Sequence, residues 1–592
     1  MNYSKDVKWN AKYDVVVIGF GGAGATAANF AAKQDSRVLL VDAAPEGSEG
    51  GNTRFAAGAF ATAKDFDKAK NYYLQSFAPF NHDEDTLNRF VHELTHLASH
   101  TKSDYKLDAH PSEMHKRAEY YEFKNSEDMI HQSMTTLYDG SFWKLLRHEV
   151  YDQLDKIDIW YDSPVQHLIQ NPETKEILGV QIEHKGRLRN IAASNGVVMS
   201  CGGYENNAEM VQTFLGRGSL APIGTLYNQG KGIDLAVEVG ARLWHMSNFD
   251  SHAFSLNEGK DREQFAYMIQ WKDLFTGSVF IAGDDGTRYL NEQCEDRHGY
   301  QYNHGDYVML PNQNHPHIVM DQAEYEQLQN SGSPKAAQIK KIIGHAVKAE
   351  TIDELAKMID APKLNQAVSD FNFFTKQGRD YIADRPTETM REFAAGPYYA
   401  IAIRHNILHT HGGARRNGEC EVLDLQGNVI PHLYEAGELG DPFATKYIGG
   451  SSVADLLISG RLAGENAAKV KGQKMEIDVT TSPSKTNDDL KTDAKLTTAS
   501  FETADNQYIG IAEQGIGDLP ITVRITVKDN QMKEIEILQE SESPSIGGKA
   551  IPVLRKEMLE ANTYDVDSIT GASATSKGIK NAVKNALDQI NE

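Results

Sequence analysis

Cysteine, long apolar runs and clustered positive charge are all scarce in this sequence. The three cysteines, Cys201, Cys294 and Cys420, are widely separated and form no CxxC pair. They exclude a disulfide framework and show no metal-ligand spacing, so we expect no metal site. No stretch of about 18 apolar residues is present, so we expect no membrane span. The opening residues, MNYSKDVKWNAKYD, lack the apolar core of a signal peptide, which predicts a cytoplasmic protein.

The charge balance is strongly acidic. The formal net charge is −23, and no long run of Lys or Arg occurs. This balance argues against nucleic acid or an anionic membrane as the main partner. It does not exclude an anionic substrate, because a few Arg and His residues can set the potential of one site.

The length of 592 residues predicts two or more domains. Residues 478–499 are rich in Thr, Ser, Lys and Asp and carry almost no large apolar side chain, which is typical of a linker. The linker separates residues 1–477 from a C-terminal module, residues 500–592. In that module, strand patterns precede a helix that places Ile579, Val583, Leu587 and Ile590 on one face, so a small α+β domain is expected.

A dinucleotide-binding unit opens the large domain. The apolar strand 15–18 runs into a GxGxxG turn at 19–24, an Ala-rich helix follows, and the next apolar strand ends at Asp42, 18 residues after Gly24. The glycines allow a tight turn, the helix N-terminus faces a pyrophosphate, and the acid accepts from ribose hydroxyls. The cofactor-binding residues predicted from this unit are Gly19, Gly21, Gly22, Ala23, Gly24 and Asp42.

Further motifs indicate which dinucleotide binds. The segment Gly50-Gly51-Asn52-Thr53-Arg54 resembles the flavin-facing turn of the flavoprotein family of soluble fumarate reductases, urocanate reductases and 3-oxosteroid dehydrogenases. Similar motifs recur at 198–204, 230–234, 434–438 and 449–456, so the resemblance spans about residues 13–470. In that family the last loop sets a helix N-terminus against the flavin, where the helix dipole favours the reduced anion. The resemblance implies FAD, bound additionally by Gly51, Asn52, Thr53, Gly58, Gly202, Gly203, Asp234, Glu438, Ser451 and Ser452.

The C-terminal module carries a second flavin motif. Residues 567–575, DSITGASAT, resemble the D-x-x-[ST]-G-A-[ST]-x-[ST] signature of small bacterial FMN-binding domains, in which FMN is attached through a phosphoester bond. The resemblance implies covalent FMN on Ser573, attached by a flavin transferase, with the helix N-terminus favouring the phosphate. The alternative is a Ser/Thr-rich helix cap, although a cap needs one hydroxyl and the stretch 568–576 has five.

Some of the family's catalytic residues have counterparts in this sequence. Leu408-His409-Thr410-His411-Gly412-Gly413 matches the family's H-T-x-G-G, which implies that His409 binds a substrate carboxylate. The family's proton-donating Arg corresponds to Arg297, although strict register would place Asp296 there. The alternatives are a neutral core histidine and an arginine in a surface ion pair.

Other positions depart from the family. Tyr447, beside Lys446, replaces the Arg that clamps the same carboxylate, and Lys272 and Phe275, next to Trp271, stand where a Glu and an Arg are usual. One end of the pocket is therefore expected to be aromatic. A Tyr at this position also occurs in 3-oxosteroid dehydrogenases, where it polarises a ketone, so we include Tyr447 with Arg297 and His409 among the predicted catalytic residues.

The predicted fold is α/β: a Rossmann-like FAD-binding domain, an inserted α+β capping domain at roughly 245–390, and the C-terminal α+β FMN-binding domain. The predicted function is reduction of the C=C bond of an α,β-unsaturated, aromatic or heteroaromatic monocarboxylate. Electrons would pass from an external donor, such as an NADH-dependent flavin reductase, to FMN, then FAD, then substrate. The alternatives are a fumarate reductase or 3-oxosteroid oxidoreductase on the same scaffold, and a covalent-flavin electron carrier without a substrate of its own.

Overall fold

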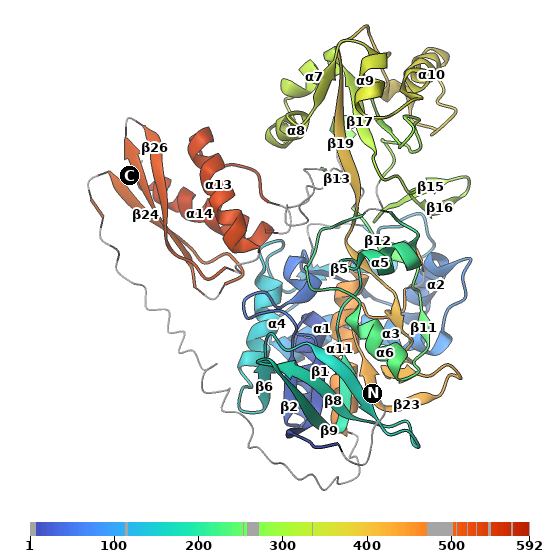
Figure 1. Cartoon of the computed structure of the whole chain (residues 1–592), viewed down its shortest axis with the longest axis vertical. Coiled ribbons are helices and arrows are strands. Elements are labelled where there is room, and N and C mark those ends of the chain that lie inside the picture. Colours follow the sequence, from blue (N-terminus) through green and yellow to red (C-terminus); the bar gives the residue numbers. More distant parts are fainter. Residues whose placement is uncertain are drawn as a thin grey trace. The chain divides into compact units, whose positions relative to one another are not determined.

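Figure 1 shows the computed structural model of the chain. It describes residues 7–112, 117–218, 220–252, 254–256, 272–295, 297–333, 335–443, 445–469, 501, 503–504, 506–517, 519–528, 530–542, 546–569 and 572–590. The predicted linker, 478–499, lies outside the described residues.

The chain divides into two compact units. The first comprises Met1–Met210, Gly224–Phe249 and His409–Glu592, and the second comprises Val211–Ile223 and Asp250–Leu408. The second unit contains most of the predicted insertion, 245–390, and continues to Leu408. It extends that far because β19 (Tyr398–Ile407) pairs with four other strands of its sheet.

The first unit is built on an eight-stranded sheet with the order β22-β23-β9-β1-β2-β6, to which β7 and β8 add antiparallel strands. The central strand β1 (Ala11–Ile18) is parallel to both of its neighbours. Val15, Val16 and Val17 are fully buried, as a parallel strand covered on both faces requires. The other strands are β2 (Val38–Val41), β6 (Ile157–Trp160), β7 (Val165–Gln170), β8 (Ile177–His184), β9 (Arg187–Met199), β22 (Glu421–Leu423) and β23 (Val429–Glu435).

Two helices of this unit pack unusually closely. A Cβ atom on Gly460 or Gly464 of α11 (Ser451–Lys469) would lie 2.7 or 2.3 Å from backbone oxygens of α1 (Gly22–Lys33). The small residues therefore hold the middle of α11 against the first half of α1, next to the GxGxxG turn. Other elements of this unit are α2 (Phe66–Phe77), α3 (Glu84–Tyr105), α4 (Ser141–Tyr151), α6 (Lys231–Glu238) and the small sheet of β3 (Ala59–Ala63), β4 (His110–Pro111) and β5 (Met129–Ser133).

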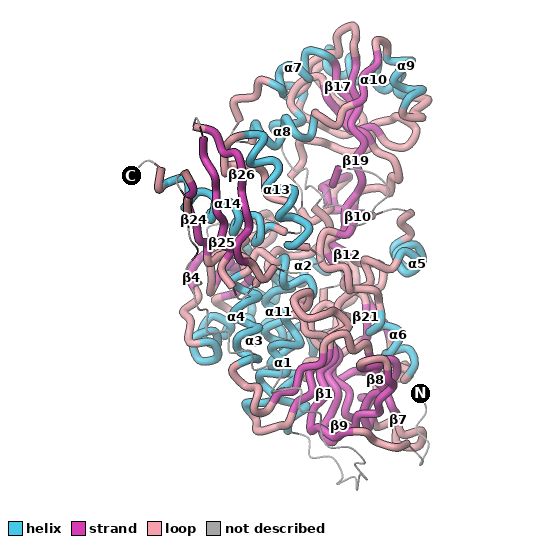
Figure 2. Tube along the Cα trace, turned by 60° about the vertical axis from the view of Figure 1, so that its left-hand side comes forward, coloured by secondary structure: helices cyan, strands magenta, loops and turns pink. Residues whose placement is uncertain are grey.

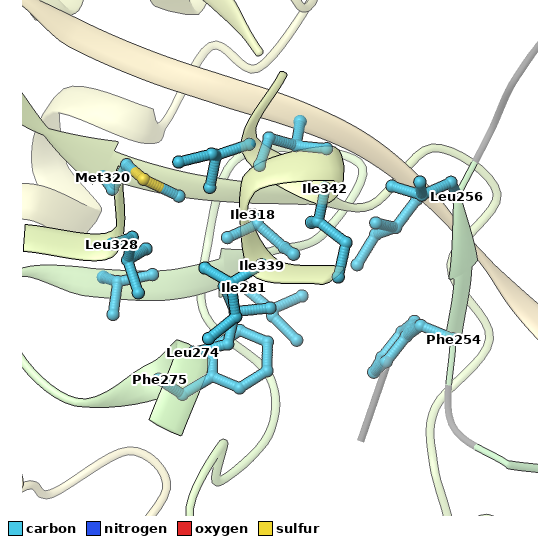
Figure 3. Close-up of a cluster of buried hydrophobic side chains, with 14 of the residues drawn as sticks. Phe254, Leu256, Leu274, Phe275, Ile281, Ile318, Met320, Leu328, Ile339 and Ile342 are labelled. Atoms are coloured by element: carbon cyan, nitrogen blue, oxygen red, sulfur yellow. The ribbon is translucent and has the colours of Figure 1, made fainter. Parts of the chain in front are cut away.

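The second unit surrounds a six-stranded sheet in which β19 is central. Aliphatic and aromatic side chains fill its core, and Figure 3 shows Phe254, Phe275, Ile318 and Ile339 packed together there. The strands are β10 (Ala221–Pro222), β13 (Phe254–Leu256), β14 (Val279–Ala282), β17 (His317–Asp321) and β18 (Val347–Ala349). The helices are α7 (Gln322–Gln329), α8 (Ala336–Ile343), α9 (Ile352–Met358) and α10 (Leu364–Gln377), and β15 (Tyr300–Asn303) and β16 (Asp306–Met309) form a hairpin.

The C-terminal module is the predicted α+β domain. Its antiparallel sheet, β24-β25-β26, packs against α13 and α14 (Figure 2). The expected apolar helix face is present through Ile579 and Val583, but Ile590 is 37% exposed because α14 ends at Asp588. The elements are β24 (Gln507–Ala512), β25 (Ile521–Lys528), β26 (Gln531–Gln539), α13 (Gly547–Ala561) and α14 (Ser573–Asp588).

A search of the helices in the described part of the chain found none with the length and apolar character that a membrane crossing needs.

Candidate active site

The GxGxxG turn has the close backbone contacts that a dinucleotide site requires. Gly19 has φ +102°, and a Cβ atom on Gly24 would lie 1.8 Å from the Gly19 carbonyl oxygen. Asp42, at the end of β2, accepts the backbone N–H of Phe20 at 2.5 Å and of Ala44 at 2.7 Å. Burial raises the pKa of Asp42 to about 6. Through these two hydrogen bonds, the carboxyl group stabilises the turn against which a ribose would bind.

The GGNT turn lies beside this loop. Residues Gly51–Phe55 form a short 3₁₀ helix, and the Thr53 hydroxyl accepts the backbone N–H of Gly22 at 3.1 Å. Gly58, close to this turn in the sequence, has φ +87°. The structure thus brings together two glycine turns that are 30 residues apart in the chain, as the predicted cofactor site requires.

The carboxyl groups of Glu205, which is buried, and Glu438, which is half-buried, face each other next to the GGNT turn. The Asn52 amide donates to Glu205 at 2.8 Å and to Glu438 at 3.0 Å, and the Asn228 amide donates to the same two oxygens at 2.8 and 2.6 Å. The backbone N–H of Gly203 also donates to Glu438, at 3.2 Å. Burial raises the pKa of Glu205 to about 7, and burial together with the charge of Glu205 raises the pKa of Glu438 to about 8. Glu205 and Asn228 were not predicted from the sequence.

His409 and Tyr447 meet at the first turn of α11. His409 Nε2 lies 3.0 Å from the Ser452 hydroxyl, and the backbone N–H of Ser452 donates to the Tyr447 hydroxyl at 3.2 Å. The two rings are 5.6 Å apart and almost perpendicular. Ser451 is fully buried and shares a 2.7 Å hydrogen bond with the Tyr73 hydroxyl. The structure therefore assembles four of the predicted residues around one helix N-terminus.

An aspartate–histidine pair, Asp441 and His411, lies next to the rings of His409 and Tyr447. His411 Nδ1 lies 2.6 Å from Asp441 Oδ2, and both side chains are fully buried. The His411 ring is 4.8 Å from that of His409 and 5.7 Å from that of Tyr447. Phe443 completes an aromatic surface with Tyr447, at a centroid distance of 6.2 Å. His411 and Asp441 were not predicted as site residues from the sequence, although His411 lies inside the matched H-T-x-G-G motif.

A buried ion pair secures the strands that carry these residues. Arg416 donates to both carboxylate oxygens of Asp455, at 2.9 and 2.8 Å, and lies 3.6 Å from Glu435. These contacts join the segment after His411 to β23 and α11. Both of these hydrogen bonds come from Nη2 of the buried guanidinium, and charge-assisted bonds of this kind are strong, so they help to fix the position of the helix start that holds His409.

Several other predicted residues have different surroundings. Arg297 belongs to the second unit, where it is 3% exposed, lies 3.2 Å from Glu295, and has its guanidinium over the Tyr307 ring. Asp234 is exposed on the first turn of α6. Asp296, the alternative to Arg297, lies outside the described residues.

The aromatic end of the pocket was expected to include Phe275 and Trp271. Phe275 is instead a side chain of the second unit's hydrophobic core (Figure 3), and Lys272 is exposed. Trp271 lies outside the described residues. Lys446, next to Tyr447, is buried and donates to the Ala78 carbonyl oxygen at 2.6 Å. The aromatic surface in the first unit therefore consists of Tyr447, Phe443 and the two histidines.

The hydroxyl groups of the C-terminal motif, residues 568–576, have different surroundings. Thr575 donates to the buried Glu542, and the Ser576 hydroxyl accepts from Ile569 N–H at 3.0 Å and donates to the Ala572 carbonyl at 2.8 Å. Ser573 is exposed as the first residue of α14. Thr570, Gly571 and the upstream 543–545 segment lie outside the described residues. Of the four described hydroxyls, Ser573 combines exposure with a helix N-terminus, the position suited to a phosphoester.

Comparison with known proteins assigns both cofactor domains. A family model described as the FAD binding domain matches residues 14–452. The chain belongs to this family. A second model, the FMN-binding domain, matches residues 515–588. The protein is therefore a flavoprotein with an FAD-binding domain and a C-terminal FMN-binding domain, as the sequence predicted.

The relatives of this FAD-family chain are reductases. It is 25% identical over 477 residues to a probable fumarate reductase of Shewanella frigidimarina, covering 77% of this chain and 74% of the relative. It is 24% identical over 499 residues to the vinyl phenol reductase of Lactiplantibacillus plantarum, covering 78% and 97% of the two chains. It is 23% identical over 487 residues to the urocanate reductase of Eggerthella lenta, covering 77% and 74%.

Solved structures support the fold. The 3-ketosteroid delta1-dehydrogenase of Sterolibacterium denitrificans matches with a TM-score of 0.62 at 18% identity, covering 77% of this chain and 99% of that one. An open flavocytochrome c3 fumarate reductase matches with a TM-score of 0.56 at 22% identity, covering 78% and 79%. The predicted α/β fold with an FAD-binding domain is confirmed.

The residues present fit FAD. Glycine turns leave the backbone open at the position of a pyrophosphate, and Asp42 lies at the end of β2 beside them. The buried Glu205 Oε2 has no hydrogen-bond partner among the described residues, and an unpaired buried oxygen is costly. A ligand rich in hydroxyl groups, such as the ribityl chain of FAD, would supply the missing donor.

Proposed function

We propose that this protein reduces the C=C bond of an α,β-unsaturated monocarboxylate with an aromatic or heteroaromatic ring, such as a cinnamate, hydroxycinnamate or urocanate. The observation that carries the proposal is the pairing of His409 with an aromatic surface at Tyr447 and Phe443. A histidine suits one carboxylate, and the aromatic rings suit a second, uncharged end of the substrate.

The aromatic rings bear on whether the substrate carries one carboxylate or two. A second carboxylate buried against Tyr447 and Phe443 would cost several kcal/mol or would have to be protonated. The neighbouring Lys446 already donates to the Ala78 carbonyl oxygen. An aromatic ring in the same place would gain about 0.5–1.5 kcal/mol from ring contacts beyond its area burial. The site therefore favours cinnamate-like acids over fumarate.

The residues of the chain have separate roles in this proposal. His409, held by Ser452, binds a carboxylate oxygen, and the Tyr447 hydroxyl stands where the family's clamp would be. Arg297 would supply the proton to the alkene carbon next to the one that receives the hydride. The bound flavins would supply the hydride and the electron relay.

The C-terminal module would be the electron entry point. We assign covalent FMN to Ser573, attached by a flavin transferase, and expect an external donor such as an NADH-dependent flavin reductase. The exposed Ser573 hydroxyl at the start of α14 supports this assignment. The proposed location is the cytoplasm.

Two other activities have a specific observation in their favour. Tyr447 supports a 3-oxosteroid oxidoreductase, in which a tyrosine hydroxyl would polarise a ketone. The vinyl phenol reductase match covers 97% of that relative, and a vinylphenol carries an aromatic ring without a carboxylate. The aromatic surface argues against a fumarate reductase. A pure electron carrier would not need His409, because it binds no substrate carboxylate.

The test is oxidation of reduced viologen by the purified holoenzyme with cinnamate, urocanate, fumarate, 4-vinylphenol and a 3-oxo-4-ene steroid. We expect kcat/KM for cinnamate or urocanate to exceed that for fumarate at least tenfold. Comparable rates on fumarate, or turnover of 4-vinylphenol or the steroid alone, would contradict the proposal.

A further inference from the structure

Helix α3 carries an H-E-x-x-H pattern that the flavin chemistry does not use. The segment is HELTH, residues 92–96, and both of its histidines are exposed. Residues four positions apart lie next to each other on one face of a helix. Two histidines at this spacing on a helix are a known zinc-binding arrangement. The expectation of no metal site was based on the cysteines, which have no such spacing.

The tautomer of His96 follows from its contacts. His96 Nδ1 lies 2.8 Å from the backbone oxygen of His92, and a carbonyl oxygen only accepts, so Nδ1 carries the proton. The Thr95 hydroxyl is consistent with this assignment. It donates to the same carbonyl oxygen at 2.7 Å, so it can only accept from His96 Nδ1, which is 3.1 Å away. The lone pair of the His96 ring is therefore on Nε2, where a metal ion can bind.

A buried carboxylate lies beside the His92 ring. His92 Nδ1 is 3.5 Å from Oε1 of Glu93, whose side chain is 5% exposed. Metal-binding histidines almost always direct their other ring N–H toward a carboxylate, a carbonyl oxygen or water, which fixes the tautomer and makes the ring a better ligand. Glu93 can act in this way for His92, as the His92 carbonyl oxygen does for His96. Both rings then offer Nε2 as the ligand atom.

The rings of His92 and His96 are also close enough to share one ion. Their centroids are 4.7 Å apart, and the planes are 29° from parallel. Two Zn–N bonds of about 2.0–2.1 Å at a tetrahedral angle separate the nitrogens by about 3.3 Å. A small turn of the His92 side chain, which is 56% exposed, brings the two Nε2 atoms to that separation. Because both residues are exposed, an ion can reach them from solvent.

His100 is the next histidine on the same face of α3. Its ring centroid is 6.1 Å from that of His96, farther than the His92 ring. His92 and His100 are eight residues apart, about 12 Å along the helix, so one ion cannot bind both. The shorter ring distance therefore selects His92 and His96 as the chelating pair.

We propose that His92 and His96 chelate one divalent transition-metal ion through their Nε2 atoms. Imidazole suits Zn²⁺, Cu²⁺ and Ni²⁺, whereas Mg²⁺ and Ca²⁺ prefer oxygen ligands. Water would complete the coordination of the ion. This site is separate from the flavin sites, and it does not depend on the proposed function.

The site should bind the ion without hydrolysing a substrate. In zinc peptidases with this pattern, the glutamate is the general base. Here the Glu93 carboxylate forms an ion pair with Arg461 of α11 and lies 3.5 Å from Arg89, and Glu93 is 4% exposed. A carboxylate held in this way cannot contact a water molecule on the exposed ion. Its role is therefore confined to orienting His92.

The experiment is calorimetric titration of Zn²⁺ into the full-length holoenzyme, prepared without a histidine tag and freed of metal by a chelator. We expect saturable binding of Zn²⁺ that Mg²⁺ does not reproduce. His92→Gln and His96→Gln should each raise the Kd at least tenfold. Loss of an outer partner of a ligand already costs about 10–100-fold in metal affinity, and loss of the ligand itself should cost no less. His100→Gln should change the Kd less than threefold.

The matched control is His110→Gln, which changes an exposed histidine of β4 in the same unit. It should leave the Kd within twofold of that of the unmodified protein. All four histidines have substantial exposure, so the variants should fold. An unchanged FAD content and an unchanged Tm in the presence of a chelator verify this.

Four outcomes would overturn the site. The first is the absence of saturable Zn²⁺ binding to the unmodified protein. The second is equal Zn²⁺ affinity in all four variants, which would place the ion elsewhere. The third is a loss of affinity in the His96 and His100 variants but not in the His92 variant, which would move the pair one turn along α3. The fourth is Mg²⁺ binding as tight as that of Zn²⁺, which would indicate acidic oxygen ligands. Each of these outcomes leaves the proposed function unaffected.

Discussion

The backbone N–H of Ser452 donates to the Tyr447 hydroxyl at 3.2 Å, so the tyrosine caps the first turn of the helix that carries the His409 contact. The hydroxyl oxygen is thereby fixed in position. Any role of Tyr447 in binding should depend on that hydroxyl and not on the ring alone.

Tyr447→Phe should lower kcat/KM for cinnamate by about tenfold, because it removes one placed hydrogen-bond donor and leaves a helix N–H without its acceptor. Lys272→Ala is the comparison, since Lys272 is exposed in the second unit and should change kcat/KM less than twofold. Steady-state kinetics with reduced viologen measure both. Equal effects of the two variants would mean that Tyr447 does not contact the substrate.

Ser573→Ala should abolish covalently attached FMN and leave bound FAD unchanged, because the residues that fit FAD lie in 19–58, 202–228 and 438–452. Denatured protein is separated on a gel, and flavin fluorescence in the band is read. Ser568→Ala is the control, because Ser568 is also exposed but precedes the helix. A fluorescent Ser573→Ala band would refute the attachment site.

The same variant tests the direction of electron flow. Ser573→Ala should retain viologen-driven reduction within about twofold and lose at least 90% of the activity driven by NADH and a flavin reductase, since covalent FMN would be the entry point for the physiological donor. The ratio of the two activities is the measurement. An unchanged ratio would show that electrons reach FAD without the C-terminal module.

The raised pKa values of Glu205 and Glu438 predict how the stability of the protein depends on pH. Their pKa values, about 7 and about 8, are raised from the ordinary value of 4.5. A raised carboxyl pKa gives stability that is present below pH 4.5 and is lost as the pH rises through the folded-state pKa. We therefore expect the Tm to fall between pH 5 and 8, with each carboxyl group contributing at most about 1.4 kcal/mol per pH unit.

Glu205→Gln should make that fall shallower, because one of the two facing acids is gone while the Asn52 and Asn228 amides keep an acceptor. Thermal unfolding at constant cofactor content, followed by circular dichroism at four pH values, measures the slope. Glu209→Gln, which changes an exposed glutamate, should leave the slope as it is. An unchanged slope in Glu205→Gln would mean that Glu438 alone accounts for the titration.

The parts of the site that follow a local pattern could be predicted from the sequence. The strand, the GxGxxG turn and Asp42 occupy about 30 consecutive residues, and Ser573 stands at a helix start marked by its own motif. Glu205 and Asn228 could not be found this way, because Glu205 accepts from Asn52, 153 positions away, and Asn228 donates to Glu438, 210 positions away. His411 and Asp441 are 30 residues apart, and neither has a local signal beyond being polar.

Two expectations failed for a physical reason. Phe275 was assigned to the pocket from its alignment with a charged family residue, but its side chain packs in a hydrophobic core, where an aromatic ring is most stable. Ile590 was included in an apolar helix face by its spacing, but the helix ends at Asp588 and its periodicity no longer applies there. Spacing predicts a face only as far as the helix extends.

The strand order of the large sheet has a consequence for how the protein is made. β9 lies between β1, near the start of the chain, and β23, which begins at Val429. At a synthesis rate of about 5–20 residues per second, β1 leaves the ribosome roughly 20–80 s before β23. From the completion of β9 at Met199 until β23 is made, about 12–46 s at the same rate, the edge of β9 that will pair with β23 is open, and α11 is not yet available to cover α1. The nascent chain therefore exposes these surfaces until β23 and α11 have been made, and it can complete its FAD site only after α11 has been translated.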